Sequence, residues 1–294
     1  MKKLIFKASM FSILLFTGLT ANAQIFYKIE KPGVEKPSYI FGSHHLSPID
    51  IVEKASVSEY FGNTDQVIGE LDLTVNPMEI AMAVQSHMMA PQDSSLTKLL
   101  AGQDIDKLND QFQKFNPTPG LTLQMLDPMK PMAVTTMIAL SMSQEVMPGY
   151  DPNQQLDTYF MKEGKAQGKN IIGLETPEYQ GTVLFDSTPL TVQAENLIEM
   201  LTKPEDAIEA TKKLTEAYRN RDLDKMLELS KESDDNAEFM EAILYKRNAD
   251  WLTKLPTLIE DTPSFIVVGA LHLAGPEGVL EGLMKEGFIL TPIY

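Results

Sequence analysis

Short apolar runs near both ends of the chain predict the strands of a buried sheet. The runs cover residues 38–41, 66–71, 170–174, 264–268 and 288–293. The first two are separated by a helix signal, in which Ser47 can cap and Pro48 suits the first helical position. Strand, helix and strand at this spacing are typical of a βαβ unit, so we expect the first two runs to form a parallel pair.

The sequence between these runs is mostly helical in pattern. Apolar residues at helical spacing cover 78–89, 96–115, 132–143, about 153–167, 190–257 and 276–286. We therefore predict an α/β fold with a mainly parallel central sheet built from the N- and C-terminal parts of the chain. A large helical insertion is expected at roughly 76–165, and a second helical region at roughly 188–260, within one domain over 24–294.

The first 23 residues have the three parts of a secretory signal peptide. Lys2, Lys3 and Lys7 supply the positive end, an apolar stretch of about a dozen residues follows, and Ala21-Asn22-Ala23 offers a cleavage site. A membrane span needs roughly 20 apolar residues, so this stretch is too short. We expect a periplasmic or secreted protein with no membrane span after cleavage.

Composition narrows the chemistry. The chain has 41 acidic and 25 basic residues, a formal charge of -16, and no cysteine. Such an acidic chain is a poor candidate for binding nucleic acid or anionic membranes, which requires a basic face. The absence of cysteine excludes disulfides, thiolate metal sites and thiol nucleophiles. Imidazole and carboxylate chemistry remain.

Histidine and glutamate follow four of the predicted strands. The first run leads into Gly42-Ser-His-His45, the second into Glu70, the third into Glu175 and the fourth into Gly269-Ala-Leu-His272. Parallel sheets bind ligands at the carboxyl ends of their strands, so these side chains should converge. Imidazole and carboxylate without thiolate suit Mn, Co or Zn. Such an ion polarises a carbonyl, while a spare glutamate takes a proton. Which glutamate is ligand and which is base stays open.

The repeated Gly-x-x-His favours a functional role. A single histidine at a strand end more often caps local backbone, but two of the chain's four histidines, His45 and His272, share this context. The alignment of the two copies leaves His44 as a structural neighbour. His87 lies in a methionine-rich helix and is expected at the surface or in a groove.

Together these residues resemble those of the TraB/GumN (TraB/PrgY/GumN) family, which also contains the Tiki-type metalloproteases. The resemblance rests on stretches 39–45, 69–72, 173–176 with Gln180, 247–248 before Trp251, and 268–275. It implies a fold like that of erythromycin esterase and haem-binding ChaN-like proteins, and metal-dependent peptide cleavage with Mn or Co. In this comparison His45 and His272 match the motif histidines, and Glu70 and Glu175 match the acidic positions. His44 stands where the family more often has an apolar residue.

The leading hypothesis is an exported metal-dependent hydrolase acting on a peptide or protein. His45, His272, Glu70 and Glu175 would hold the metal and do the chemistry, and Arg247 would hold a substrate carboxylate or a developing oxyanion. A surface salt bridge is the plainer role for Arg247. The alternative function is non-catalytic binding of haem or a small ligand, and a third is an interaction protein with a degenerate site. No oligomeric state is predicted.

Overall fold

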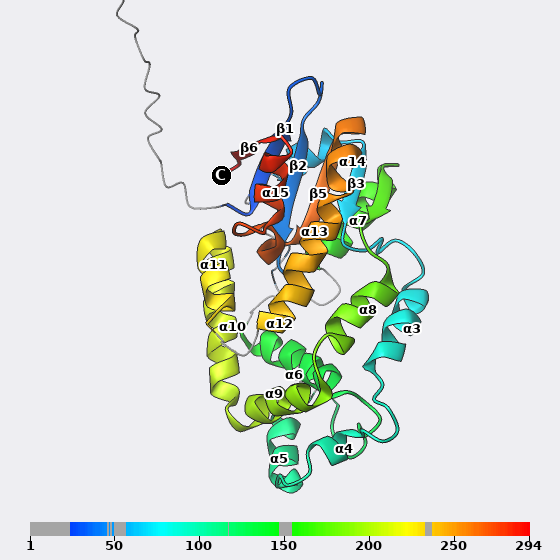
Figure 1. Cartoon of the computed structure of the whole chain (residues 1–294), viewed down its shortest axis with the longest axis vertical. Helices are drawn as coiled ribbons and strands as arrows, with labels where there is room; N and C mark the ends of the chain where they lie inside the picture. Colours follow the sequence, from blue (N-terminus) through cyan, green and yellow to red (C-terminus); the bar gives the residue numbers. More distant parts are fainter. Residues whose placement is uncertain are drawn as a thin grey trace, which may run out of the picture.

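The fold is built on one six-stranded sheet. The structure, a computed structural model, describes residues 24–45, 47, 49, 57–116, 118–146, 155–232 and 237–294. The strands lie in the order β4 (Asn170–Gly173), β3 (Gln66–Gly69), β5 (Ser264–Gly269), β2 (Ser38–Ser43), β1 (Phe26–Glu30) and β6 (Ile289–Pro292) (Figure 1). The first four are parallel, and β1 pairs antiparallel with both β2 and β6. The predicted α/β fold with a mainly parallel sheet is confirmed.

The lateral order of the strands differs from the prediction at two places. The prediction that β2 and β3 pair with each other is wrong, because β5 from the C-terminal part of the chain lies between them. Ile266 of β5 pairs with Ile40 of β2 on one side and with Ile68 of β3 on the other. This central place agrees with five consecutive buried residues at the start of β5. Strand β1 was not predicted, because its apolar residues are interrupted by the partly exposed Lys28. Its position beside the edge strand β6 requires no continuous apolar run.

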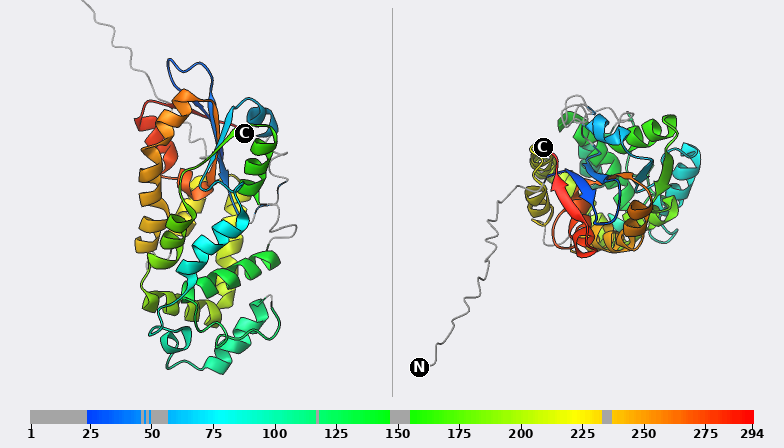
Figure 2. Two further views of the ribbon diagram at one scale, coloured as in Figure 1. Left: turned by 90° about the vertical axis from the view of Figure 1, so that its right-hand side faces the viewer. Right: turned by 90° about the horizontal axis from the view of Figure 1, so that it is seen from above.

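Helices cover both faces of the sheet. On one face α7 (Leu156–Ala166) packs against β3, β4 and β5. The other face is covered by α13 (Lys246–Leu252), α14 (Leu255–Asp261) and α15 (Val279–Lys285). Figures 1 and 2 show this arrangement in two orientations. Close packing of α7 depends on Gly164, where an added Cβ would lie 2.5 Å from Cγ2 of Val67.

A helical lobe with its own hydrophobic core extends from the carboxyl end of the sheet (Figure 1). It contains α3 (Pro77–Met88), α4 (Leu96–Leu99), α5 (Ile105–Phe115), α6 (Pro131–Val146), α8 (Pro177–Asp186) and α9 (Leu190–Thr202). The single helix predicted over 96–115 is two helices, because Gly102 has a φ of +90° and interrupts it. Helix α8 was not predicted.

Two helical runs connect the lobe to the sheet. One is α10 (Pro204–Arg219) followed by α11 (Leu223–Ser230). The other begins with α12 (Ala237–Met240), continues through the π-helical turn η2 (Glu241–Tyr245) and passes without interruption into α13. This second run extends from the lobe side toward the carboxyl end of the strands (Figure 1). Its last helix, α13, contains Arg247.

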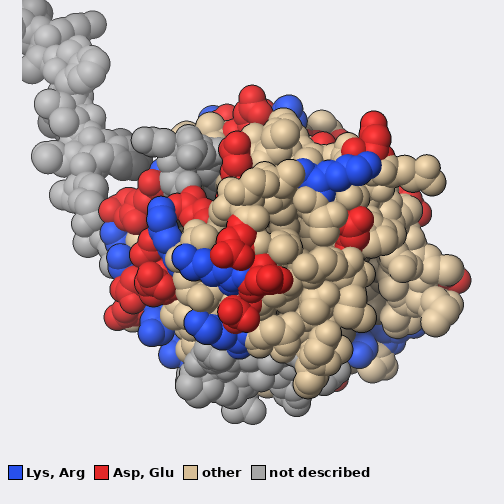
Figure 3. Space-filling model, turned by 90° about the horizontal axis from the view of Figure 1, so that it is seen from below, with Lys and Arg blue, Asp and Glu red and all other residues tan. Residues whose placement is uncertain are grey.

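The remaining predictions concern the charged surface, membrane spans and the signal peptide. On the lobe end of the molecule, acidic and basic side chains are interspersed (Figure 3). None of the helices in the described ranges has the length and apolar character needed to cross a membrane. The predicted signal peptide lies outside the described residues, as does most of the helix expected to begin at Ser47.

Candidate functional site

The four parallel strands bring the predicted site residues to one edge of the sheet. Ser43 is in register with Gly269, and Gly69 is in register with both Val267 and Gly173. The side chains that follow these positions therefore leave the sheet at the same level. The short 3-10 helix η3 (Ala270–Leu273) then turns the second Gly-x-x-His motif back over the edge.

The Arg247 guanidinium lies at the centre of the group. It donates through Nε and Nη2 to the two carboxylate oxygens of Glu175, at 2.7 and 2.9 Å. Nη2 also donates to Oε2 of Glu70 at 2.6 Å, and Nη1 donates to Nε2 of His272 and the carbonyl of Ile243, both at 3.0 Å. These bonds use all five donors of the guanidinium. Arg247 therefore holds its neighbours in place, and in this arrangement no donor is left for a substrate.

Glu175 is fully committed to this network. Its side chain is 1% exposed, and its Oε1 also accepts a hydrogen bond of 2.9 Å from Nε1 of Trp251. A buried carboxylate with a bidentate arginine partner and a further donor is a stable positioning group. The structure places Glu175 beneath the site, where it orients Arg247.

Glu70 faces the site opening. Its Oε1 accepts the backbone N–H of Gly269 at 2.9 Å, and its Oε2 accepts from Arg247 and, at 3.3 Å, from Nε2 of Gln180. Burial acts to raise the pKa of Glu70, but the electrostatic interactions with His272, Arg247 and His45 and the hydrogen bond from the Gly269 N–H outweigh burial and lower the pKa to about 2. Glu70 is therefore a carboxylate at neutral pH.

His272 is neutral, with its tautomer set by its partners. Because Arg247 can only donate, Nε2 of His272 accepts, and Nδ1 carries the proton that it donates to Oδ1 of Asn248 at 2.6 Å. The Asn248 amide is oriented by its bond to the carbonyl of Glu277. The imidazole packs on Trp251, with ring centroids 4.3 Å apart. Burial lowers the pKa of His272 to about 3.

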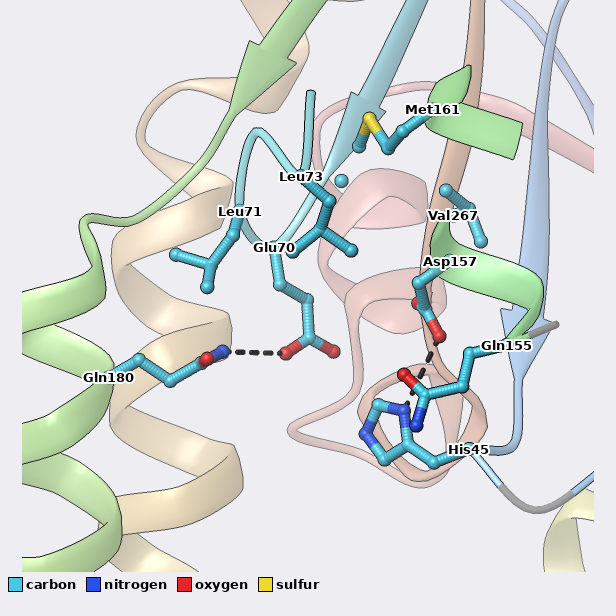
Figure 4. A pocket seen from close by; sticks show the side chains of 10 residues that line it. His45, Glu70, Leu71, Leu73, Gln155, Asp157, Met161, Gln180 and Val267 are labelled. Carbon is cyan, nitrogen blue, oxygen red and sulfur yellow. Dashed lines mark hydrogen bonds and ion pairs between the residues drawn. The ribbon is translucent and has the colours of Figure 1, made fainter. Parts of the chain in front are cut away.

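His45 is the accessible histidine of the site. Its side chain is 62% exposed, and its Nδ1 lies 3.4 Å from Oδ2 of Asp157, a buried oxygen that has no other hydrogen-bond partner among the residues that the structure describes (Figure 4). The other oxygen of Asp157 accepts from the Ser43 hydroxyl at 2.8 Å. The Asp157 carboxylate raises the pKa of His45 to about 9, so His45 is an imidazolium at neutral pH.

Asp157 is a site residue that the sequence analysis did not single out. Taken alone, an aspartate in the first turn of α7 is explained by its favourable charge at a helix N-terminus. In the fold that same turn faces the end of β2, so Asp157 reaches both Ser43 and His45. No spacing pattern links positions more than a hundred residues apart, and thus the sequence held no signal for this pair.

The other two histidines have separate environments. His44 stacks on Tyr218 with ring centroids 5.0 Å apart, and burial lowers the pKa of His44 to about 4. His87, on α3, lies 2.6 Å from a carboxylate oxygen of Asp186 on α8, away from the strand ends. Lys130 binds the other oxygen of Asp186. His44 is a neighbour of the site, and His87 joins two helices of the lobe.

The four predicted metal ligands do not fit a shared ion in this arrangement. Within the described ranges, no three histidine, aspartate or glutamate side chains converge on a point that could hold a metal. Glu70, Glu175 and His272 all direct hydrogen-bond acceptor atoms at the Arg247 guanidinium, which already supplies a positive charge at their centre. His45 is not part of this group and pairs instead with Asp157. Four-ligand coordination would require Arg247 to withdraw.

Two hollows adjoin the exposed part of the site. Both are lined by His45, Glu70 and Gln180. The smaller, of about 150 Å³, continues between the turn after β3 and α7 (Figure 4). The larger, of about 430 Å³, continues between α8, α10, η2 and η3. The larger volume lies in the range of small-molecule binding sites, roughly 300–1,000 Å³.

Comparison with known proteins gives a family assignment. No match was found among curated proteins or among solved structures. The model of the TraB/PrgY/gumN family matches residues 25–292, which is nearly the whole chain and includes every residue of the site. The chain therefore belongs to the TraB/PrgY/gumN family.

Proposed function

We propose that this protein is an exported hydrolase that cleaves peptide bonds at the carboxyl end of the parallel sheet. One observation carries the proposal: the His45 imidazole and the Glu70 carboxylate line the same hollows at the carboxyl ends of the parallel strands, and their pKa values are shifted in opposite directions, to about 9 and about 2. Titratable pairs whose environments separate their pKa values are typical of acid and base partners. The family resemblance and the N-terminal segment support peptide cleavage and export.

The two groups have complementary roles in this proposal. Glu70 is the carboxylate that orients a water molecule and accepts its proton as the oxygen attacks the scissile carbonyl. His45 is the imidazolium that polarises the carbonyl oxygen and then donates its proton to the departing amine. Asp157 holds His45 and keeps it protonated. Arg247 and Glu175 act as positioning residues that fix the Glu70 carboxylate.

Metal dependence stays a prediction of the family resemblance. The chemistry that Mn, Co or Zn would supply is polarisation of the carbonyl and activation of water. The described side chains offer no ready site for such an ion, so the proposed steps are assigned to protein groups alone. Elemental analysis of the purified protein, compared with a His45→Ala/His272→Ala variant, tests whether these residues hold a metal.

The test of the proposed function is turnover of a mixed library of fluorogenic peptides, with chelator and with added Mn, Co or Zn. His45→Ala and Glu70→Gln are each expected to lower kcat/KM by about 10²-fold or more. The chain supplies matched controls in His87→Ala and Glu195→Gln, which lie outside the site and should keep full activity.

Two results would overturn the proposal. The first is absence of cleavage by the wild type under every metal condition. The second is equal activity of wild type, His45→Ala and Glu70→Gln. An intense visible absorption band after haem addition, without turnover, would instead favour the alternative of a ligand-binding protein.

A further inference from the structure

The two hollows have three residues in common and otherwise separate walls. His45, Glu70 and Gln180 line both. Beyond these shared residues one hollow extends toward α7 and the other toward α8, α10 and η2. A substrate held at His45 and Glu70 therefore has one space for the group on each side of its scissile bond, and the two spaces are unequal.

The larger hollow is apolar away from the reacting groups. Its outer wall is formed by Leu184, Leu214, Met226, Phe239, Ile243 and Leu244. The charged and titratable side chains of its lining are gathered at one end, where His45, Glu70, Arg247 and His272 lie. A ligand that fills this space must be apolar along its length, because a polar group among these side chains would lose its hydrogen bonds to water. Its polar atoms belong at the strand ends.

The smaller hollow limits the size of the side chain that it can hold. Its apolar wall consists of Leu71, Leu73, Met161 and Val267 (Figure 4). Its volume of about 150 Å³ is that of a cavity known to accept a benzene ring. The larger hollow has roughly three times this volume. A side chain as large as that of tryptophan therefore has room in the larger hollow and exceeds the smaller one.

We infer that the substrate is a peptide with one bulky apolar residue beside the scissile bond and a smaller residue on the other side. This inference rests on the proposed function for the identity of the scissile bond. The bulky residue lies in the hollow between α8, α10 and η2, and Leu184 on α8 sets its limit. The binding energy comes from the burial of apolar surface and is independent of turnover.

The experiment measures peptide binding in a variant whose turnover is expected to be strongly reduced. His45→Ala is suitable, because the side chain is exposed and its loss leaves the buried network intact. Fluorescein-labelled peptides with identical flanks carry Ala-Ala, Leu-Ala, Ala-Leu or Trp-Trp at the centre, and anisotropy gives each Kd. The better of the two single-leucine peptides should bind at least about tenfold more tightly than Ala-Ala. Trp-Trp should bind no better than that peptide.

Variants of the wall identify the hollow. Leu184→Trp in the same background should remove the preference for leucine while leaving the Ala-Ala peptide unaffected. Leu214→Trp, from α10, serves as a second wall variant if the first does not fold by circular dichroism. The matched control is Met82→Trp on α3, an exposed apolar position outside both hollows, which should keep the preference.

The outcomes separate the inference from the proposed function. Equal affinity for all four peptides, or a leucine preference that survives both wall variants, overturns the inference. A preference that Leu184→Trp removes, in a protein whose wild type cleaves none of the peptides, supports the binding hollow and refutes the hydrolase. Cleavage of these peptides by the wild type, together with equal affinity of the variant for all four, supports the hydrolase and overturns the inference.

Discussion

Replacement of Glu175 by glutamine is the sharpest test of the buried network. The variant keeps the volume of the side chain but removes the charge that neutralises Arg247 and places an amide N–H where two donors, Arg247 and Trp251, require an acceptor. Both partners of the ion pair are buried, with side-chain exposures of 4% and 1%. Removing one partner of a buried pair typically costs about 3–5 kcal/mol. We expect a loss of this size for Glu175→Gln.

The measurement is urea unfolding followed by tryptophan fluorescence. Trp251 is the only tryptophan of the chain and is bonded to Glu175, so the signal reports directly on this region. With a urea slope of about 1–3 kcal/mol/M, the unfolding midpoint should fall by about 1 M or more. Glu195→Gln, an exposed change of the same kind on α9, should stay within about 0.5 kcal/mol of the wild type. A loss below about 1 kcal/mol for Glu175→Gln would refute the view that this pair holds the site together.

Four further outcomes follow from the same structure. As pH rises through about 9, His45 loses its proton, so kcat/KM should fall, and His45→Asn should remove that limb of the profile. His272 is neutral when folded with a pKa of about 3, against about 6.5 unfolded, so urea titrations should show stability falling as pH drops between these values. Asn248→Ala leaves the buried Nδ1–H of His272 without its acceptor and should cost about 1–3 kcal/mol by urea unfolding. Gly42→Ala, whose Cβ would lie 2.9 Å from Cα of Ala270, should cost about 1–3 kcal/mol by overpacking and lower the thermal midpoint.

Much of the sheet could be predicted from the sequence, for a physical reason. Strands that are buried on both faces have continuous apolar sequences, and each such run ends where the chain leaves the core. The residues at the ends of the runs, including Glu70 and Glu175, were therefore placed correctly at one edge. The lateral order of the strands was not predictable, because the sequence of an apolar run does not indicate which other strand lies beside it. The central place of β5 depends on packing across the whole chain.

The partnership at the centre of the site could not be predicted either. Helical periodicity identifies the face of α13 that is buried, but not the element that it meets. Arg247 and Glu175 are 72 positions apart, and their contact depends on the path of the helical run from the lobe to the sheet. Reasoning from residue types favoured a metal between two histidines and two glutamates. The structure has a guanidinium in the middle of three of those four groups.

The site divides into a buried part and an exposed part, and the division gives variants different meanings. Arg247, Glu175 and His272 bond to one another out of solvent, so their replacement should lower stability and activity together. His45 is exposed and pairs with Asp157, so its replacement should lower activity and cost less stability than the loss of a buried partner. A variant set measured by both assays therefore distinguishes a hydrolase from a protein that keeps only the buried network. In the latter, His45→Ala would have no effect on turnover.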